Sequence, residues 1–374
     1  MASSSAYTPT LTITPDTVIR RERRLPLPGE VRVAVGEVVS AEQIVAATAL
    51  PGRVSALNVA RELNLPPAEI ERWMVKHPGD PVAHNEVLAE YKSFFGFFKA
   101  QALSPTTGTL EAISAVTGQA LVRGPALPVE LSAYVSGAVV EIVPQESVTI
   151  ECRCALLQGI LGVGGEAHGP LAVLGERADQ GFSADEISDA HAGCVVVSGT
   201  PLDWALLERL REVGAAAVVV GAMPAADLDR LLGAPLGVAI TGQERLGLTV
   251  VLTEGFGSLP MAEETFALLR SRNGAAAAVN GATQIRAGVL RPEVIIPLSG
   301  KTEAAPPAST AGLAVGSRIR LVRDPYFGRL GHVSELPSRP EAIPTEAEVR
   351  VLRARLDDGE EVTVPRANVE LIER

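Results

Sequence analysis

Two apolar runs in the middle of the chain lead into loops whose residue types could do chemistry. The runs, residues 248–252 and 275–279, have the length and composition of strands that are covered on both faces. If these strands are parallel neighbours, the loops that follow them meet at one edge of the sheet, where open parallel sheets bind ligands. The predicted site residues are Glu254, Gly255, Gly257, Asn280, Thr283, Gln284 and Arg286.

Arg286 suggests which ligand such a site would take. A guanidinium holds a carboxylate or phosphate with two hydrogen bonds, and glycines let a ligand approach the backbone closely. The loops therefore predict a pocket for an anion. A structural alternative stays open, in which the glycines serve turns and Glu254 pairs with Arg286 to lock the two loops together.

The remaining reactive residue types form no catalytic or metal-binding pattern. Cys152 and Cys154 are separated by one residue, but Cys194 is the only other thiol, and no Cys-x-x-Cys or His-x-x-x-His accompanies them. His168 lies in a glycine-rich stretch, residues 155–172, that lacks the Walker pattern. We expect reduced cysteines, no bound metal and no cofactor. The absence of a catalytic set favours a non-enzymatic protein.

The elements that would position the loops are predicted to form an α/β domain over residues 151–298. Short apolar runs alternate there with amphipathic helices at about residues 201–213, 227–232 and 260–269. For the first helix, Thr200 is the predicted N-cap, Pro201 the first helical residue and Gly214 the residue just past the end.

Length and charge limit the architecture and the partners. A chain of 374 residues is too long for a single core and predicts several domains. A net charge of −11 argues against an extended DNA-binding surface, and no apolar run approaches the ~20 residues of a membrane-spanning helix. Residues 1–13 lack the pattern of a secretory signal, which predicts a cytoplasmic protein. Residues 1–24 are expected to be a flexible N-terminus, and the Pro, Ala, Ser and Thr content of residues 299–312 indicates a linker.

Residues 25–150 are rich in short strand-like segments separated by glycine and proline. His77-Pro-Gly-Asp-Pro-Val82 and Ser104-Pro-Thr-Thr-Gly-Thr-Leu110 resemble the barrel-sandwich hybrid fold of biotinyl and lipoyl carrier domains. In that family, a modified lysine lies between the two segments. Lys92 and Lys99 lie there but lack the carrier motif, so we expect a structural module that carries no biotin or lipoyl group. Residues 55–76 predict a helical insertion. Its two short helices have helix-turn-helix spacing, but the second lacks the cationic face of a DNA-reading helix.

The end of the chain, residues 313–374, predicts an SH3-like β barrel. The stretches at residues 314–322 and 325–333 resemble the KOW motif of ribosomal proteins and transcription elongation factors. The resemblance implies a partner-binding rim at Tyr326, Phe327 and Arg329. Arginines and carboxylates are nearly balanced here, whereas RNA-binding members of the family tend to be basic, so a protein partner is at least as well supported as RNA.

Three functions follow from these patterns. The leading one is a non-enzymatic, multi-module interaction protein whose KOW-like barrel docks on RNA or on a protein of the transcription or translation machinery. The second is a ligand-binding protein or enzyme with the anion site described above. The third is a structural subunit of a larger complex.

Overall fold

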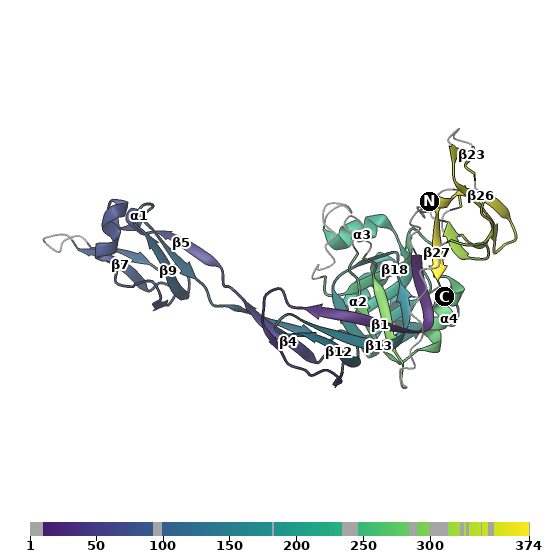
Figure 1. The fold of residues 1–374 in the computed structure, drawn as a ribbon, viewed down its shortest axis with the longest axis horizontal. Helices are drawn as coiled ribbons and strands as arrows, with labels where there is room; N and C mark the ends of the chain where they lie inside the picture. The colour runs from purple at the N-terminus through teal and green to yellow at the C-terminus, as the bar shows by residue number, and fades with distance from the viewer. Residues whose placement is uncertain are drawn as a thin grey trace.

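The computed structural model describes residues 10–92, 99–181, 183–233, 246–283, 290–298, 313–321, 325–326, 329–337, 339–342 and 348–373. Figure 1 shows a central α/β body, a β stem that leads away from it to a small distal β unit, and a C-terminal β unit on the opposite side of the body. The chain is mostly β with few helices, so the predicted mixture of α/β and β structure is confirmed at this level.

In its described residues, the body is a curled sheet with three α-helices. Its strands are β13 (Ser147–Gln158), β14 (Leu161–Val163), β15 (Glu166–Leu174), β16 (Val195–Ser198), β17 (Ala217–Met223), β18 (Thr249–Phe256), β19 (Ala276–Asn280) and β20 (Glu293–Pro297). The helices are α2 (Trp204–Glu212), α3 (Ala225–Leu232) and α4 (Glu263–Ser271), and two 3₁₀ turns, η2 (Ala184–Glu186) and η3 (Asp189–His191), precede β16.

The strand order closes the sheet on itself. From β13 the order runs through β20, β19, β15, β16, β17 and β18 to β14, and β14 begins only three residues after β13 ends. Across this short connection, the N–H of Gly159 donates to the carbonyl of Pro292 and that of Ile160 to the carbonyl of Leu252. One chain segment thus borders both β20 and β18.

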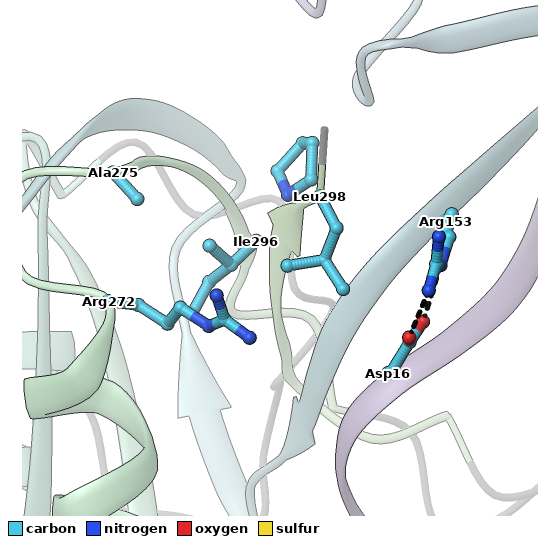
Figure 2. A pocket seen from close by; sticks show the side chains of 7 residues that line it. Asp16, Arg153, Arg272, Ala275, Ile296 and Leu298 are labelled. Carbon is cyan, nitrogen blue, oxygen red and sulfur yellow. Dashed lines mark hydrogen bonds and ion pairs between the residues drawn. The ribbon is translucent and has the colours of Figure 1, made fainter. Parts of the chain in front are cut away.

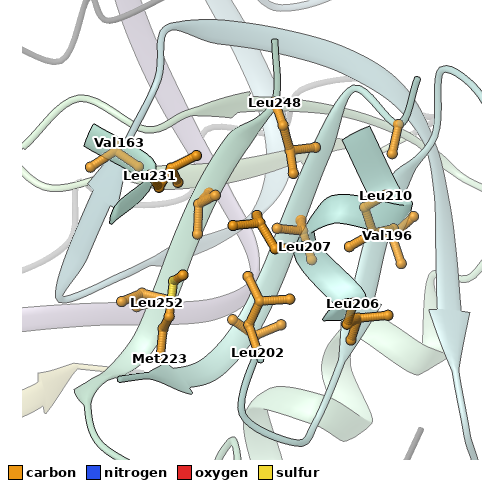
Figure 3. Close-up of a cluster of buried hydrophobic side chains, with 14 of the residues drawn as sticks. Val163, Val196, Leu202, Leu206, Leu207, Leu210, Met223, Leu231, Leu248 and Leu252 are labelled. Carbon is orange, nitrogen blue, oxygen red and sulfur yellow. The ribbon is translucent and has the colours of Figure 1, made fainter. Parts of the chain in front are cut away.

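Two apolar clusters hold the helices on the sheet. Leu202, which precedes α2, and Leu206, Leu207 and Leu210 of α2 pack with Met223 and with residues of β14, β16 and β18, as Figure 3 shows. Phe266 and Leu269 of α4 belong to the second cluster, which also contains residues of β13 and of each strand from β15 to β20. Burial of this apolar surface is the main term that stabilises the body.

The sequence located α2 correctly but not its first residue. The helix begins at Trp204, because the side chain of Asp203 accepts a hydrogen bond from Leu206 N at 2.8 Å and acts as the N-cap. Thr200, the predicted cap, instead exchanges a hydrogen bond with Ser198. Gly214 follows the helix with φ +74°, as predicted.

The N-terminal region corrects a prediction. Residues 10–24 are not a flexible terminus but form β1 (Thr10–Arg24), which pairs antiparallel with β13 along most of its length. Arginines in its second half make ion pairs with carboxylates of β13, of the more distant strands β20 and β15, and of the turn before β13: Arg20 with Glu151, Arg21 with Glu293, Arg23 with Glu166 and Arg24 with Glu146. Charge pairing therefore takes the place of apolar alternation in this half of the strand.

The stem and the distal β unit divide the region that was predicted as one module. The stem contains β2 (Glu30–Val31), β3 (Val38–Val39), β4 (Ile44–Leu50), β11 (Leu127–Ser132) and β12 (Gly137–Val143). The distal β unit, residues 54–123, contains β5 (Val54–Asn58), α1 (Val59–Leu63), η1 (Pro67–Trp73), β6 (Pro81–Val82), β7 (Val87–Lys92), β8 (Lys99–Leu103), β9 (Gly108–Ser114) and β10 (Gln119–Arg123). The helical insertion lies where predicted, with Asn64 turning the chain at φ +52°.

The C-terminal β unit, residues 313–373, has the antiparallel order β27-β21-β22-β25-β26. Its elements are β21 (Arg318–Leu321), β22 (Leu330–Glu335), β23 (Glu341–Ala342), β24 (Glu348–Val349), β25 (Val351–Leu356), β26 (Glu361–Pro365), η4 (Arg366–Asn368) and β27 (Val369–Glu373). Residues 10–12 of β1 pair in parallel with residues 371–373 of β27, so β1, which pairs with β13 of the body, also borders this unit.

Candidate functional site

The predicted anion pocket required β18 and β19 to be parallel neighbours, and this requirement is wrong. Strands β15 to β18 run parallel to one another, but β19 pairs antiparallel with β15 and is separated from β18 by β15, β16 and β17. The loops after β18 and β19 therefore leave opposite edges of the sheet. Of the residues predicted for the pocket, Gln284 and Arg286 lie outside the described residues.

The polar residues of these loops have structural partners. Thr283 Oγ1 accepts from Gly162 N at 2.8 Å and lies 3.0 Å from the carbonyl of the same residue, and Asn280 Oδ1 accepts from Ala282 N at 2.9 Å. Gly255 and Gly257 have φ of +98° and +109°, a region where other residues are strained. Both glycines therefore have a backbone role: Gly255 lies within β18 beside an irregularity in its pairing with β17, and Gly257 follows the strand.

Glu254 lies at the junction between the body and the C-terminal β unit. Its side chain is buried, with 4% exposed, and Oε1 accepts from Ala262 N at 3.1 Å, just before α4. Oε2 lies 2.7 Å from Nη2 of Arg320, which reaches across from β21. The carboxylate therefore satisfies a helix N-terminus and a guanidinium from another unit at the same time.

Among the residues that the structure describes, Arg320 is the largest fully buried side chain, with 1% exposed. Nη1 donates to the carbonyl of Thr253 at 2.8 Å, and Nη2 makes the ion pair with Glu254 without the alignment of a hydrogen bond. Nε has no hydrogen-bond partner among the residues that the structure describes. The predicted partner, Arg286, lies outside the described residues, whereas the arginine shown beside Glu254 comes from β21, a pairing that no local spacing could indicate.

A groove of about 860 Å³ runs along this junction. It is lined by residues 13–16 of β1, by the start of α4 and by the C-terminal β unit; the side chains include Ile13, Asp16, Glu263, Glu264, Thr265, Leu268, Arg318, Arg320, Leu330 and Asp357. Carboxylates outnumber arginines in this lining, so the groove favours neither phosphate nor nucleic acid.

The predicted rim of the C-terminal β unit is described in part. The guanidinium carbon of Arg329 lies 5.6 Å from the ring centroid of Tyr326, within the range of a cation–π contact. Arg329 also pairs with Glu360 at 2.7 Å and with Asp358, and these hydrogen bonds, Glu360 first, raise its pKa above the ordinary value. Phe327 lies outside the described residues.

A second polar cluster, which the sequence did not reveal, surrounds Tyr134. This tyrosine is 1% exposed and has φ +67°, a strained conformation for a bulky residue. Its hydroxyl donates to Glu293 Oε1 at 3.3 Å, and its carbonyl lies 2.9 Å from Nε2 of His168. Burial, followed by the charge of Glu293, raises the pKa of Tyr134 well above its ordinary value.

The cysteines are buried and free. The interaction between the two neighbouring thiols lowers the pKa of Cys152 and raises that of Cys154. Within the described ranges, no three His, Cys, Asp or Glu side chains cluster as a metal site requires.

The two lysines considered as carrier sites flank the gap between β7 and β8. Lys92 and Lys99 both pair with Glu90, at 2.5 and 3.0 Å. These interactions give both ammonium groups a structural partner at the end of the hairpin.

Comparison with protein-family models finds no matching family, and comparison with curated protein sequences finds no match. Among the helices described, none has the length and apolar character needed to cross a membrane.

Proposed function

We propose that this chain is a cytoplasmic, non-enzymatic interaction protein that bridges two partners, one at the distal β unit and one at the C-terminal β unit. The observation that carries the proposal is the placement of these units at opposite ends of the molecule's long axis (Figure 1). A molecule of this shape can hold two partners apart at a fixed separation.

The connection to the distal β unit supports a spacer role. The unit joins the stem through only two chain segments, residues 51–53 and 124–126, between the pairs Leu50–Leu127 and Val54–Arg123. At Gly52 the two segments approach so closely that a Cβ atom there would lie 2.1 Å from the carbonyl oxygen of Gly124. The close backbone crossing favours a defined ribbon over a loose linker.

For the C-terminal β unit, the charges favour a protein over RNA. Arg318, Arg329, Arg353 and Arg355 each pair with carboxylates of the same unit. Phosphate binding would have to compete with these pairs, because a guanidinium already neutralised gains little from a second anion. We infer a protein partner, with the transcription or translation machinery, implied by the KOW resemblance, as the first place to look.

The test compares partners captured from the native host by three tagged proteins. They are the full chain, a variant with residues 51–126 replaced by an Asn-Gly turn between Leu50 and Leu127, and the double variant Tyr326→Ala, Arg329→Ala. Each variant should lose a different partner and keep the other, and nuclease treatment should not change recovery at the C-terminal β unit. Loss of the same partner from both variants would rule out bridging, and nuclease-sensitive recovery would favour RNA.

A further inference from the structure

A second hollow, which shares Asp16 with the junction groove, lies where the end of α4 meets β20, β1 and β13. Its volume is about 470 Å³, within the range of about 300–1,000 Å³ typical of small-molecule pockets. It is lined by Asp16, Arg153, Arg272, Ala275, Ile296, Pro297 and Leu298. Figure 2 shows that these side chains come from several elements and face a common space.

One side of this hollow carries a carboxylate that is already neutralised. Asp16 accepts from Nε and Nη2 of Arg153, with Nε at 2.8 Å, and this pairing is the main cause of its lowered pKa. Asp16 is therefore ionised at neutral pH and held by Arg153 across β1 and β13.

The facing side carries Arg272, whose guanidinium projects from the end of α4 toward Leu298 and the side that holds Asp16 (Figure 2). Its Nε is buried and has no hydrogen-bond partner among the residues that the structure describes. Its charge acts on Asp16, but only weakly beside the contribution of Arg153. Two arginines and one carboxylate leave the lining with an excess positive charge, and a buried donor without a partner is costly.

The rest of the lining is apolar and comes mainly from the end of β20. Ile296, Pro297 and Leu298 form one wall, and Ala275 adds to it. We propose that this hollow binds a small organic acid, with its carboxylate on Arg272 and an apolar body against Ile296 and Leu298. The carboxylate would supply the acceptor that Nε of Arg272 lacks, and the apolar body would shield the apolar wall from water.

This inference does not depend on the bridging function, because neither proposed partner surface includes these residues. Calorimetric titration of the full chain with benzoate, acetate and inorganic phosphate tests it directly. Benzoate should bind more tightly than acetate, which lacks an apolar body, and more tightly than phosphate. Equal affinities for the three, or no heat with benzoate, would overturn the proposal.

Three variants distinguish specific binding of benzoate at Arg272 from a nonspecific effect of the protein's charge. Arg272→Gln should weaken benzoate binding by at least about tenfold, the loss expected for a charge-assisted pair of hydrogen bonds. Arg211→Gln, at an exposed position of α2 away from the hollow, should leave the affinity unchanged. Asp16→Asn removes the competing carboxylate, so it should tighten binding several-fold.

The Asp16→Asn result distinguishes a binding site from a purely structural role for the arginines. A structural role predicts a less stable protein and no gain in affinity. Unchanged benzoate binding in Arg272→Gln, or weaker binding in Asp16→Asn with the fold intact, would reject the assignment.

Discussion

Glu254 and Arg320 form the most deeply buried ion pair in the described part of the chain. Two charges removed from water gain little net stability from each other, but removal of only one leaves the other buried and uncompensated. We expect Glu254→Gln to lower the free energy of unfolding by about 3–5 kcal/mol, measured by urea denaturation. The substitution retains Oε1 as an acceptor for Ala262 N, so the loss reports on the charge.

Two comparisons make this measurement specific. Glu361→Gln breaks an ion pair with Arg355 in which both side chains are largely exposed, and it should change stability little. The double replacement Glu254→Met, Arg320→Met should recover most of the loss, because it leaves no unpaired charge. If Glu254→Gln were as stable as Glu361→Gln, the junction pair would not couple the two units.

Tyr134 gives a prediction on pH. In the unfolded chain its phenol titrates near the ordinary pKa of about 10, whereas burial keeps it protonated to higher pH in the fold. Above about pH 10 the unfolded state therefore releases a proton that the folded state retains, so stability attributable to this group is present below that pH and falls as pH rises. Urea denaturation between pH 8 and 11 should show a steeper loss for wild type than for Tyr134→Phe. Parallel curves would mean that the hydroxyl ionises freely in the fold.

At the scale of elements, the hairpin of β7 and β8 contains a carboxyl group, that of Glu90, whose pKa is strongly lowered. Hydrogen bonds from Lys92, then Lys99, lower the pKa of Glu90 to about 2. Its contribution to the hairpin is thus present above the ordinary value and is lost as pH falls from about 4.5 toward 2. NMR titration of the Glu90 carboxyl checks this, and Gln101→Ala, which removes a third donor, should raise the pKa slightly.

The same pairing bears on modification of the two lysines. We expect the intact mass of the protein from its host to show no biotin or lipoyl group, because Lys92 and Lys99 lack the carrier motif and both hold Glu90. A mass increment located on either lysine would contradict a structural role for the distal β unit.

Sequence patterns predicted local elements better than their arrangement. Apolar runs located β16 to β19 and α2, because burial acts over a few residues, although the predicted N-cap of α2 lay three residues before the observed one. They did not predict β1, whose second half is stabilised by arginine pairs with residues more than a hundred positions away. Strand order depends on such distant pairings, which is why the predicted pocket placed two antiparallel strands side by side as parallel neighbours.

For the candidate site, the sequence predicted Glu254 as a pocket residue or as the partner of Arg286, and it did not indicate the ion pair with Arg320. Position 320 reads as one of several arginines in a β unit, and nothing in its neighbourhood indicates that its side chain reaches the body. The hollow at Arg272 was missed for a related reason. Its lining comes from four distant segments, and no short motif joins Asp16, Arg153, Arg272 and Leu298.

At the scale of the whole molecule, the units differ in how they are coupled. The body and the C-terminal β unit share β1, through its pairing with β27, and the buried pair of Glu254 and Arg320. The distal β unit has its own apolar cluster, whose members all fall between Leu57 and Val122. Elements that share strands and buried contacts unfold together, whereas a unit with its own core on a two-strand ribbon can unfold alone.

We therefore expect scanning calorimetry of the full chain to show two cooperative transitions, one for the distal β unit and one for the body together with the C-terminal β unit. The variant in which an Asn-Gly turn replaces residues 51–126 should lose the first transition and keep the second, because Leu50 and Leu127 are paired and a two-residue turn can close β4 on β11. Glu254→Gln should lower the melting temperature of the second transition alone. If one transition covered the whole chain, or if the deletion shifted the remaining transition markedly, the distal β unit would be an integral part of the body's core, and a spacer function could not rest on its separation.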